Sequence, residues 1–263
     1  MKSLPLAGRR IVVTRPKGQA EMLLGLIRQA GGEPLEVPAL EIRDLAELAP
    51  FHAAIERLDS FDTAIFVSRN AVRKAFALMD GRRGVRPWPA QVRVATVGNG
   101  SREELETRGI SGVIAPDDGS DSEALLALPD FANVAGKRIV IFRGEGGRTV
   151  LGDTLTARGA LVEHAACYRR ARPAGSGALL DAALNAGKVD AVTVSSGEGL
   201  ANLLAMLGGE APRRLAGVAL FVSHPRVASE AAGHGLERVI VAGPGDAKTA
   251  AALVAYFGGA SYN

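Results

Sequence analysis

The sequence has very little cysteine, few aromatic residues and no long apolar run. Cys167 is the single cysteine of 263 residues, which excludes an intrachain disulfide and a cysteine-based zinc site and is compatible with a reducing compartment. Phe, Trp and Tyr together make up 5% of the chain, so few aromatic ligand platforms are expected. No stretch approaches about 18 uninterrupted apolar residues, and residues 1–10 lack the apolar core of a signal peptide. We therefore expect a cytoplasmic protein without a membrane partner.

The chain also has little excess charge. Its 31 Lys and Arg residues outnumber its 28 Asp and Glu residues, and 31 − 28 gives a net charge of +3. This surplus is compatible with an anionic small molecule but is far below the basic footprint of a nucleic-acid-binding domain. We therefore expect no nucleic-acid partner.

The composition that remains is that of a folded protein with many turns. Apolar residues make up 47% and charged residues 22% of the chain, close to the globular averages of about 45–50% and about 25%. The 32 glycines are roughly twice the usual share of about 7%, which predicts many tight turns. At about 100–200 residues per domain, the length predicts two domains.

Short apolar runs alternate with helical patterns along the chain, and nearly every run ends in a Gly, Pro, Ser or Asn turn. This alternation predicts βα units on parallel sheets, and runs that are apolar throughout are typical of strands covered on both faces. The predicted strands are 10–14, 63–67, 92–97, 113–115, 138–142, 191–194, 218–222 and 239–242.

The chain matches itself at an almost constant offset, which begins as 136 − 8 = 128. The matched segments are Gly8–Arg15 with Gly136–Arg143, Phe61–Ser68 with Val189–Ser196, Ala95–Ser101 with Leu220–Arg226, and Val113–Ile114 with Val239–Ile240. Two copies of a four-unit α/β module therefore account for almost the whole chain, and a tandem internal duplication is predicted. Two such sheets are expected to face a cleft lined by the carboxyl ends of their strands, where ligands usually bind.

Extended segments follow the first helix of each repeat, near residues 35–42 and 162–170. Pro38 and the alternating pattern oppose a helix there. Either these segments are second strands of their sheets, or they leave one sheet and carry the chain to the other. The pattern leaves both alternatives open.

Motifs of familiar chemistry are incomplete. Residues 143–148 follow a predicted strand and open a helix, but Thr149 stands where the third glycine of a dinucleotide fingerprint belongs. The same segment offers backbone N–H groups beside Arg143 and Arg148, which suit a carboxylate or phosphate. Residues 195–197 lack the preceding glycine of a nucleophile elbow, and the four histidines lack metal-ligand spacing, so we assign those histidines to packing or surface. We expect no cofactor and no metal.

Small polar residues stand at the ends of several predicted strands. They are Thr14, Arg15, Ser68, Arg69, Asn70, Gly98, Asn99, Gly100, Ser101, Ser195, Ser196, Gly197, Ser223 and His224. Helix capping explains any one of them taken alone. Together they rim a cleft with hydroxyls and helix N-termini, which is an environment for a polyanionic ligand.

A series of short motifs, in order over about residues 8–257, resembles the uroporphyrinogen-III synthase family. The motifs are Val13-Thr14-Arg15-Pro16, Phe66–Val72, Ala95–Gly98, Arg143-Gly144 with Gly147-Arg148, Leu155, Arg158–Ala160 and Tyr168-Arg169. No single motif is specific, and the resemblance rests on their order and spacing.

The resemblance implies an α/β fold of two flavodoxin-like parallel-sheet domains joined by a two-stranded β-ladder. Domain one would contain residues 1–35 and 171–263, domain two residues 43–161, and the ladder residues 36–42 and 162–170. Each domain then mixes both sequence repeats, so a cut at the repeat boundary near residue 131 would be wrong. The family also implies a monomer.

The implied activity is that of a cofactor-free hydro-lyase of tetrapyrrole and haem biosynthesis. Hydroxymethylbilane, a linear tetrapyrrole, closes to uroporphyrinogen III with loss of water and inversion of the terminal pyrrole ring through a spiro intermediate. Because the bilane loses its hydroxyl readily, positioning can supply much of the barrier reduction, and no triad, metal or carboxylate pair is needed. A transient contact with the bilane-producing enzyme is a further expectation.

The resemblance also assigns roles to matching positions. Tyr168 would be the catalytic residue, giving a hydrogen bond or a proton to the departing hydroxyl. The substrate-binding residues would be Thr14, Arg15, Ser68, Asn70, Gly98, Ser101, Arg143, Gly144, Arg148, Ser195, Ser196, Gly197 and Arg226. Where the family often has Gly-Pro-x-Thr, this chain has Ser223-His224-Pro225-Arg226, so Arg226 would replace the threonine contact with a charged one.

Two alternatives belong to other functional classes. A binding module of two α/β lobes needs no catalytic group, but the export signal of a periplasmic receptor and the basic segment of a transcriptional sensor are both missing. A two-domain glycosyltransferase is opposed by the short chain and by the lack of a nucleotide-sugar motif. The product isomer formed from hydroxymethylbilane distinguishes these classes.

Overall fold

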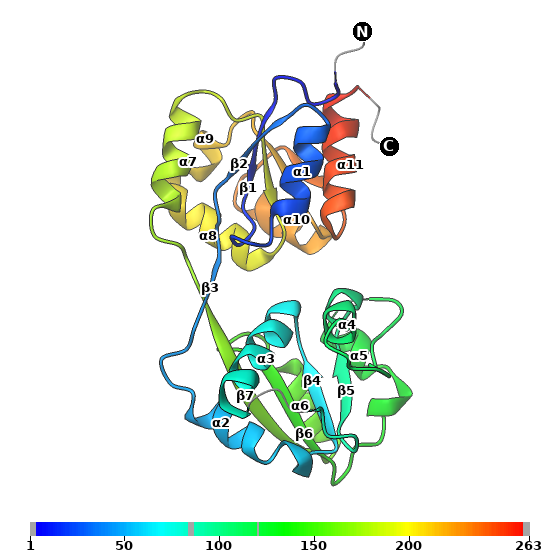
Figure 1. The fold of residues 1–263 in the computed structure, drawn as a ribbon. Helices are drawn as coiled ribbons and strands as arrows, with labels where there is room; N and C mark the ends of the chain where they lie inside the picture. The colour runs from blue at the N-terminus through cyan, green and yellow to red at the C-terminus, as the bar shows by residue number, and fades with distance from the viewer. Residues whose placement is uncertain (1–3, 84–86, 120, 260–263) are drawn as a thin grey trace. The chain divides into compact units, whose positions relative to one another are not determined.

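Seven of the eight predicted apolar runs form strands of two five-stranded sheets in a computed structural model that describes residues 4–83, 87–119 and 121–259 (Figure 1). Each sheet belongs to one compact unit. Unit 1 joins the residues up to Glu41 with those from Ala171 onward, and unit 2 is Ile42–Arg170. The ends of the predicted first domain, residues 1–3 and 260–263, lie outside the described residues.

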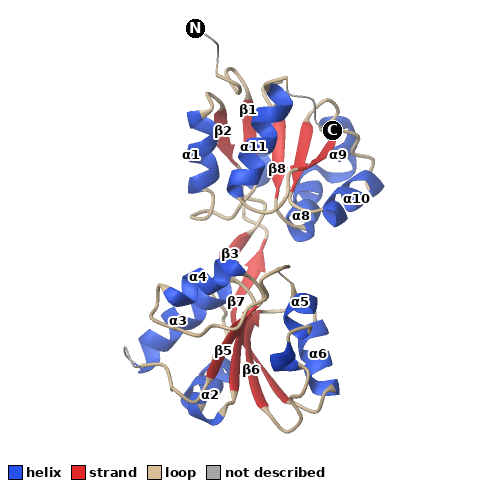
Figure 2. Cartoon of the chain, turned by 90° about the vertical axis from the view of Figure 1, so that its right-hand side faces the viewer, coloured by secondary structure: helices blue, strands red, loops and turns tan. Residues whose placement is uncertain are grey.

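In unit 1 the strand order is β10-β9-β8-β1-β2, and neighbouring strands run parallel. The strands are β1 (Arg10–Val13), β2 (Glu33–Glu36), β8 (Ala191–Val194), β9 (Ala219–Val222) and β10 (Val239–Val241). When these five strands are renumbered 1 to 5 in chain order, their spatial order starting from β2 is 2-1-3-4-5. This is the strand order of flavodoxin-like sheets. β8 and β9 are buried at every residue, because helices cover both faces of the sheet (Figure 2).

The two faces of the unit 1 sheet pack against different helices. The helices are α1 (Glu21–Gln29), α7 (Ser176–Asn185), α8 (Gly197–Leu207), α9 (Ala211–Arg214), α10 (Pro225–Gly233) and α11 (Asp246–Phe257), with a 3-10 turn η3 (Gly208–Glu210). Ile11 and Val13 of β1 face α1 and α11, whereas Val12 faces α7, α8 and α10. Successive strand residues thus enter opposite cores, which explains why β1 is apolar throughout.

Unit 2 repeats this architecture with the order β3-β7-β6-β4-β5, and the pairs β7–β6, β6–β4 and β4–β5 are parallel. The strands are β3 (Glu41–Arg43), β4 (Thr63–Phe66), β5 (Arg93–Thr96), β6 (Arg138–Gly144) and β7 (Leu161–Ala171). Beyond β5, Ile114 forms an isolated parallel bridge to Ala95. The strand predicted at 113–115 is reduced to this bridge, because the left-handed Gly112 (φ 67°) precedes it and Pro116, which lacks an N–H, follows it.

Helices also cover both faces of the unit 2 sheet. They are α2 (Ala49–Glu56), α3 (Arg69–Arg83), α4 (Asn99–Glu106), α5 (Ser122–Leu126) and α6 (Val150–Ala157), with 3-10 turns η1 (Leu58–Ser60) and η2 (Pro129–Phe131). Phe66 and Phe142 stack at 4.8 Å between ring centroids on the face that packs against α2 and α3. Ile65 and Ile141 face α5 and α6 on the other side.

The sequence repeat reappears as equivalent strand positions in the two sheets. β1 and β6 match at the offset of 128. β1 lies next to β2 in its sheet, and β6 lies next to β7 in the other sheet. β8 and β4 match at the same offset and pair with β1 and β6 respectively. Each sheet therefore combines strands from both sequence repeats, and the chain passes between the units at 41/42 and at 170/171.

The pattern of segment 162–170 left open whether it is a second strand of its sheet or carries the chain to the other sheet, and in the structure it does both. β7 pairs with β6 from Leu161 onward, so it is a strand of the unit 2 sheet over the range that was predicted as ladder. β3 lies on the other side of β7, at the point where the chain passes between the units. β2, by contrast, ends at Glu36 as a strand of unit 1.

Each sheet has one aspartate, at a repeat-equivalent position, that links neighbouring strands at the amino edge. The amino edge is the edge where the parallel strands begin. Asp62 accepts the backbone N–H of Arg138 at 2.8 Å and contacts Lys137 Nζ at 3.0 Å. Asp190 makes the same two contacts, with the backbone N–H of Arg10 at 2.9 Å and with the preceding arginine side chain at 2.7 Å. The hydrogen bond from Arg138, followed by that from Lys137, lowers the pKa of Asp62. These contacts anchor the beginnings of neighbouring strands.

Replacing this carboxylate tests the anchor. Asp62→Asn is expected to lower the free energy of unfolding by about 1 kcal/mol at neutral pH, as for one hydrogen bond to a partly exposed charge. Because the folded-state pKa is lowered, the stabilisation is complete above the unfolded value of about 3.9 and is lost as pH falls through the folded value. Urea unfolding at neutral pH and at about pH 3 should show the difference from the parent shrinking at low pH. Asp59→Asn, at an exposed residue of η1, is the control, and an equal loss at both pH values contradicts the assignment.

Candidate functional site

Polar residues gather at the carboxyl edge of the unit 2 sheet, which is the edge where its parallel strands end. Ser68 follows β4, Gly98 and Ser101 follow β5, and Gly144 ends β6. Parallel strands place all their βα turns at one edge, so residues that are far apart in sequence become neighbours there. This edge contains the candidate catalytic group.

The hydroxyl of Tyr168 is held inside unit 2. It comes from β7 and lies 3.1 Å from Ser68 Oγ, while the tyrosine as a whole is 0% exposed. Ser68 Oγ also accepts the backbone N–H of Ala71 at 3.0 Å, as a residue preceding α3 does when it caps the helix. Arg170 Nη2 lies 3.4 Å from the phenol oxygen, and its guanidinium carbon lies 5.8 Å from the ring centroid.

These contacts set the direction of the hydrogen bond between Tyr168 and Ser68. Arg170 carries only donors, so the phenol oxygen accepts from it. A buried phenol O–H needs an acceptor, and Ser68 Oγ is the acceptor within reach. Ser68 then accepts from both Ala71 and Tyr168, and its own hydroxyl hydrogen remains available to donate. The group that can reach a ligand is therefore Ser68, with Tyr168 behind it.

Gly144 makes room for the Tyr168 ring. A Cβ at Gly144 would lie 2.8 Å from Cε2 and 2.9 Å from Cζ of Tyr168, which is closer than real Cβ contacts allow. The register of β6 against β7 shifts between Arg143 and Gly144, and the Glu145 N–H donates to the Tyr168 carbonyl at 2.7 Å. An irregularity of this kind re-aims side chains at the end of a strand.

Arg143 organises the loop that follows β6, residues 145–148, here called the Arg143 loop. Its guanidinium donates to the carbonyls of Gly144 at 3.3 Å, of Arg148 at 3.2 Å and of Gly146. Arg148 forms an exposed ion pair with Glu123 of α5. Arg143 thus stabilises the loop, while Arg148 is free to exchange its partner.

A cavity of about 200 Å³ lies beside the Arg143 loop, entirely within unit 2. Its lining includes four basic side chains, namely Arg143, Arg148, His164 and Arg170. These residues come from the end of β6, from the loop before α6 and from β7. The arrangement suits an anionic group.

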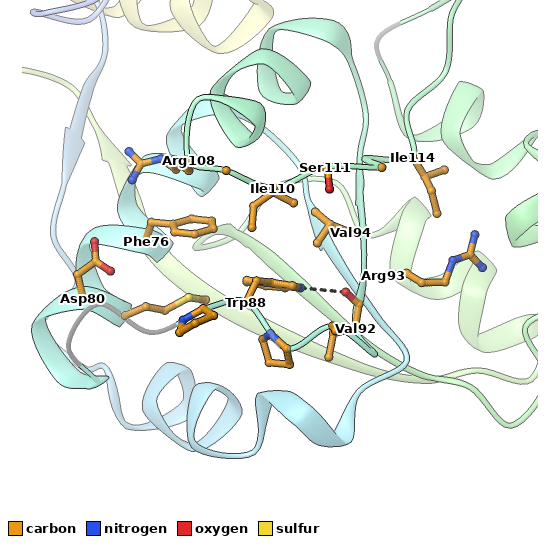
Figure 3. Close-up of a pocket in the computed structure, with 16 residues that line it drawn as sticks. Phe76, Asp80, Trp88, Val92, Arg93, Val94, Arg108, Ile110, Ser111 and Ile114 are labelled. Carbon is orange, nitrogen blue, oxygen red and sulfur yellow. Dashed lines mark hydrogen bonds between the residues drawn. The ribbon is translucent and has the colours of Figure 1, made fainter.

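A larger cavity of about 910 Å³ lies elsewhere in unit 2 (Figure 3). It is walled by Phe76 and Trp88, whose rings stack at 5.9 Å, and by Val92 and Arg93 at the beginning of β5. The indole N–H of Trp88 donates to the Val92 carbonyl at 2.9 Å. This cavity contains none of the predicted site residues, so size alone does not identify the site.

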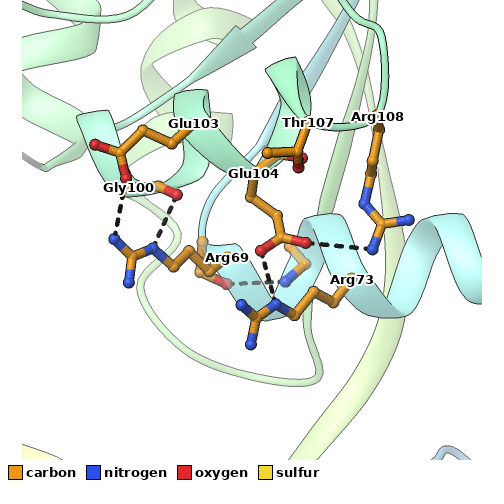
Figure 4. A network of polar contacts seen from close by, with 9 residues as sticks. Arg69, Arg73, Gly100, Glu103, Glu104, Thr107 and Arg108 are labelled. Atoms are coloured by element: carbon orange, nitrogen blue, oxygen red, sulfur yellow. Dashed lines mark hydrogen bonds and ion pairs between the residues drawn. The ribbon is translucent and has the colours of Figure 1, made fainter. Parts of the chain in front are cut away.

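A polar network joins α3 to α4 beside the carboxyl edge (Figure 4). Arg69 donates to the Gly100 carbonyl at 2.8 Å, and a Cβ at Gly100 would clash with the Arg69 guanidinium. Glu104 accepts from Arg73 at 2.8 Å and from Arg108 at 3.2 Å. The network fixes the first turn of α4, which contains the buried Ser101 and follows Gly98.

At the carboxyl edge of unit 1, several predicted ligand contacts are occupied by internal partners. The Thr14 hydroxyl is buried and donates to the Thr193 carbonyl at 2.7 Å. Ser196 caps α8 by accepting the Gly199 N–H at 3.1 Å. The Ser195 carbonyl accepts the hydroxyl of Ser223 at 2.8 Å. These residues stabilise the edge and leave backbone groups, more than side chains, for a ligand.

The two predicted arginines of unit 1 are paired with carboxylates. Arg15 Nη2 lies 2.9 Å from Asp246 Oδ1, and these side chains are 24% and 11% exposed. Arg226 Nη1 lies 3.3 Å from Glu230 Oε1, and Glu230 Oε2 would be 2.6 Å from a Cβ at Gly197. His224 caps α10 by accepting the Arg226 backbone N–H at 3.1 Å.

Cys167 packs in the unit 2 core and is not a nucleophile. Burial raises the pKa of its thiol to about 12, so the reactive thiolate is not populated at neutral pH. Among residues 4–83, 87–119 and 121–259 no cluster of three or more His, Cys, Asp or Glu side chains is placed to hold a metal ion. In the same residues, no helix has the length and apolar character to cross a bilayer.

Comparison with known proteins identifies the family. A profile described as uroporphyrinogen-III synthase HemD matches residues 21–255. The uroporphyrinogen-III synthase of Escherichia coli (strain K12) is 35% identical over 197 residues, which cover 75% of this chain and 79% of that protein. The chain belongs to the uroporphyrinogen-III synthase HemD family.

Other family members agree with this assignment. The uroporphyrinogen-III synthase of Salmonella typhimurium (strain LT2) is 36% identical over 193 residues, covering 73% of this chain and 78% of that protein. A mutant uroporphyrinogen III synthase from the extremely thermophilic bacterium Thermus thermophilus matches with a TM-score of 0.65 at 16% identity, covering 94% of this chain and 97% of that chain. Uroporphyrinogen-III synthetase from Helicobacter pylori 26695 matches with a TM-score of 0.57 at 17% identity, covering 92% and 96%. The predicted α/β fold with two mainly parallel sheets is confirmed.

Membership in the uroporphyrinogen-III synthase family also confirms the predicted activity. The chain has uroporphyrinogen-III synthase activity, a hydro-lyase reaction of tetrapyrrole biosynthesis. This result decides against the binding module and the glycosyltransferase.

The structure distributes the predicted site residues over the carboxyl edges of both units. Unit 2 holds Ser68, Asn70, Gly98, Ser101, Arg143, Gly144, Arg148 and Tyr168. Unit 1 holds Thr14, Arg15, Ser195, Ser196, Gly197 and Arg226. Sequence reasoning did not select Asp246, Glu123, His164 or Arg170 as site residues. The repeat offset pairs Arg15 with Arg143, which directs attention to both strand ends but not to the acidic partners.

The contact between Gly144 and Tyr168 yields a direct test. Gly144→Ala is expected to displace the ring and to lower the free energy of unfolding by about 1–3 kcal/mol, the usual cost of overpacking a core. Gly25→Ala is the matched control, because nothing lies within 4 Å of a Cβ there and Gly25 is inside α1. That control should gain about 0.5–1 kcal/mol. Thermal unfolding compares the stability of the two variants. Increased stability in both variants would mean that the Tyr168 ring fits without a glycine at position 144.

Proposed function

We propose that the carboxyl edge of unit 2 binds hydroxymethylbilane and assists the departure of its hydroxyl group, with Ser68 as the donor and Tyr168 behind it. The substrate follows from the family, and the reaction proposed is closure to uroporphyrinogen III. The observation that carries the proposal is the Ser68 hydroxyl, which accepts from Ala71 at 3.0 Å and lies 3.1 Å from Tyr168. Its own hydrogen is left for the ligand.

The proposed reaction needs few protein groups. The carbon–oxygen bond of the hydroxymethyl group breaks, driven by the electrons of its pyrrole, and the oxygen leaves as water with a hydrogen bond or proton supplied through Ser68. A substituted carbon of the terminal pyrrole then attacks to form the spiro intermediate. The bond between this carbon and the neighbouring methylene then breaks, and the methylene bonds instead to the free α-carbon of the same pyrrole, which inverts the ring. Loss of the proton from that α-carbon restores the pyrrole. Tyr168 supplies the hydrogen bond that holds Ser68 in position.

Substrate carboxylates can replace internal carboxylates that now neutralise the arginines. Arg148 and Glu123 are 57% and 52% exposed, and pairs of this exposure contribute about 0.2–1 kcal/mol, so a substrate carboxylate can displace Glu123. The exposed Arg226–Glu230 pair can exchange in the same way. The less exposed Asp246 is expected to stay and to orient Arg15. In unit 1 the proposed binding set also includes Thr14 and the backbone groups at 195–197. In unit 2 it also includes Asn70 and the backbone groups at 98–101.

We also propose that the protein works without a cofactor and as a monomer in the cytoplasm. The division into residues 1–35 with 171–263, residues 43–161, and the linking segments 36–42 and 162–170 belongs to the same proposal. A transient contact with the bilane-producing enzyme remains a prediction.

The order of two mutational effects tests the roles of Ser68 and Tyr168. Ser68→Ala removes the donor itself and is expected to lower kcat for isomer III about 100-fold, the lower range for positioned proton donors. Tyr168→Phe leaves Ser68 in place and removes one hydrogen bond, so a fall of about tenfold is expected. Both are measured with enzymatically generated hydroxymethylbilane, with the isomers separated by chromatography.

Ser68→Ala also removes a helix cap, because Ser68 accepts the Ala71 N–H. Asp121→Ala is the control for the effect of losing a helix cap alone. Asp121 caps α5 by accepting the Ala124 N–H at 2.9 Å, and its loss should cost about 1 kcal/mol of stability with little effect on kcat. A larger fall in kcat for Tyr168→Phe than for Ser68→Ala contradicts the proposal that Ser68 is the donor to the substrate. Unchanged isomer III formation in both variants removes both roles.

A further inference from the structure

The cavity beside the Arg143 loop contains an imidazole that the predicted site does not use. His164 lies on β7 in register with Ile141 of β6, four residues before Tyr168. Its ring packs against Gly152 of α6, where a Cβ would lie 2.6 Å from Cε1 and 2.7 Å from Nε2 of His164. A glycine inside a helix costs about 1 kcal/mol relative to alanine, and here it gives the space that the ring occupies.

Charged groups reach His164 from each neighbouring element. Burial and then the Arg143 charge lower the pKa of His164 from its ordinary value, whereas Asp153 of α6 raises it. Arg148 and Arg170 line the same cavity, and Glu123 of α5 pairs with Arg148. His164 is therefore mainly neutral at neutral pH while no ligand is bound.

His164 differs from the other basic groups of the cavity in having no committed hydrogen bond. Arg143 donates to carbonyls of its loop, and Arg148 pairs with Glu123. Among the residues that the structure describes, the His164 imidazole has no hydrogen-bond partner. Its ring is exposed toward the cavity. An anion entering this space therefore finds a side-chain donor that does not have to give up another contact.

The size of the cavity limits what can enter. About 200 Å³ is below the about 300–1,000 Å³ of sites for drug-sized ligands, so a pyrrole chain does not fit but one of its side chains does. Four basic residues in the lining select an anionic side chain.

We infer that His164 is a specificity-determining residue that binds one acetate or propionate carboxylate of the linear tetrapyrrole in this cavity. The inference rests on the proposed use of the carboxyl edge of unit 2. A bound carboxylate favours the imidazolium form and offsets the nearby arginine charges. Binding therefore takes up a proton, and KM falls as pH falls toward the imidazole range, with little change in kcat.

Steady-state kinetics with enzymatically generated hydroxymethylbilane test this inference at about pH 6.5 and pH 8.5. Because a bound carboxylate raises the pKa of His164, the parent KM is expected to be about five- to tenfold lower at pH 6.5 than at pH 8.5. His164→Gln should raise KM by a similar factor at pH 6.5, abolish its pH dependence and leave kcat within about twofold. Isomer I, the product of spontaneous closure, is quantified separately.

His52→Gln is the matched control, since His52 lies on α2 of the same unit with its ring 6.0 Å from Phe51 and does not line the cavity. The control should keep the parent KM and its pH dependence. Thermal unfolding of both variants accompanies the kinetics, because a merely structural role would lower the melting temperature without changing the pH dependence of KM. A parent KM independent of pH, or His164→Gln kinetics equal to those of His52→Gln, overturns the inference.

A second pair of variants distinguishes failure of this inference from failure of the proposed site. Arg148→Gln should raise KM about fivefold, whereas Arg93→Gln, which breaks the similarly exposed pair with Asp130 at the beginning of β5, should not. If Arg148→Gln raises KM and His164→Gln does not, the inference alone fails. If neither raises KM, the proposed binding edge fails with it.

Discussion

The parallel alignment of buried strands is the constraint on which the rest of this structure depends. Both sheets are covered by helices on both faces, so the central strands are apolar over most of their length, and polar groups gather at the strand ends and in the turns that follow them. Asp62 and Asp190 bind the amino edges by accepting backbone N–H groups of adjacent strands. The carboxyl edges remain for ligand chemistry. The sequence repeat corresponds to the same arrangement in each unit, and each sheet combines strands of both sequence repeats.

One residue of the proposed site in unit 2 lies inside the core. Tyr168 is fully buried, and its ring fits because Gly144 has no side chain. Packing and chemistry are therefore coupled, because the same ring that fills the core also holds Ser68 by its hydroxyl. This arrangement suits a reaction in which holding the substrate matters more than strong acid or base catalysis, since fixed geometry can supply several kcal/mol of the barrier reduction. Arg148 of the same unit forms a weak surface pair with Glu123 that a polycarboxylate can displace.

Much of the fold could be predicted from the sequence because it depends on local patterns and on the repeat. The apolar runs located seven of the ten strands, and the offset of 128 linked Arg15 with Arg143. The other three strands, β2, β3 and β7, overlap the extended segments whose assignment the pattern left open. The patterns failed where contacts between distant segments decide the outcome. The burial of Tyr168 depends on a register shift of β6 against β7, and the position of His164 depends on Gly152 of α6. The partner of Arg15 is Asp246, which lies more than 200 residues away in the chain, and no local pattern announces such a pair.

Hydrogen–deuterium exchange of the unmodified protein, with and without uroporphyrin III as a stable octacarboxylate probe, tests the central claim most directly. Binding should slow exchange at the backbone amides of residues 68–71 and 144–150, where Ser68 and the Arg143 loop are proposed to meet the ligand. Amides at the amino edge, including that of Arg138, which is bonded to Asp62, should be unchanged. Protection confined to the amino edge, or no protection at 68–71 and 144–150 under saturating probe, would contradict the account.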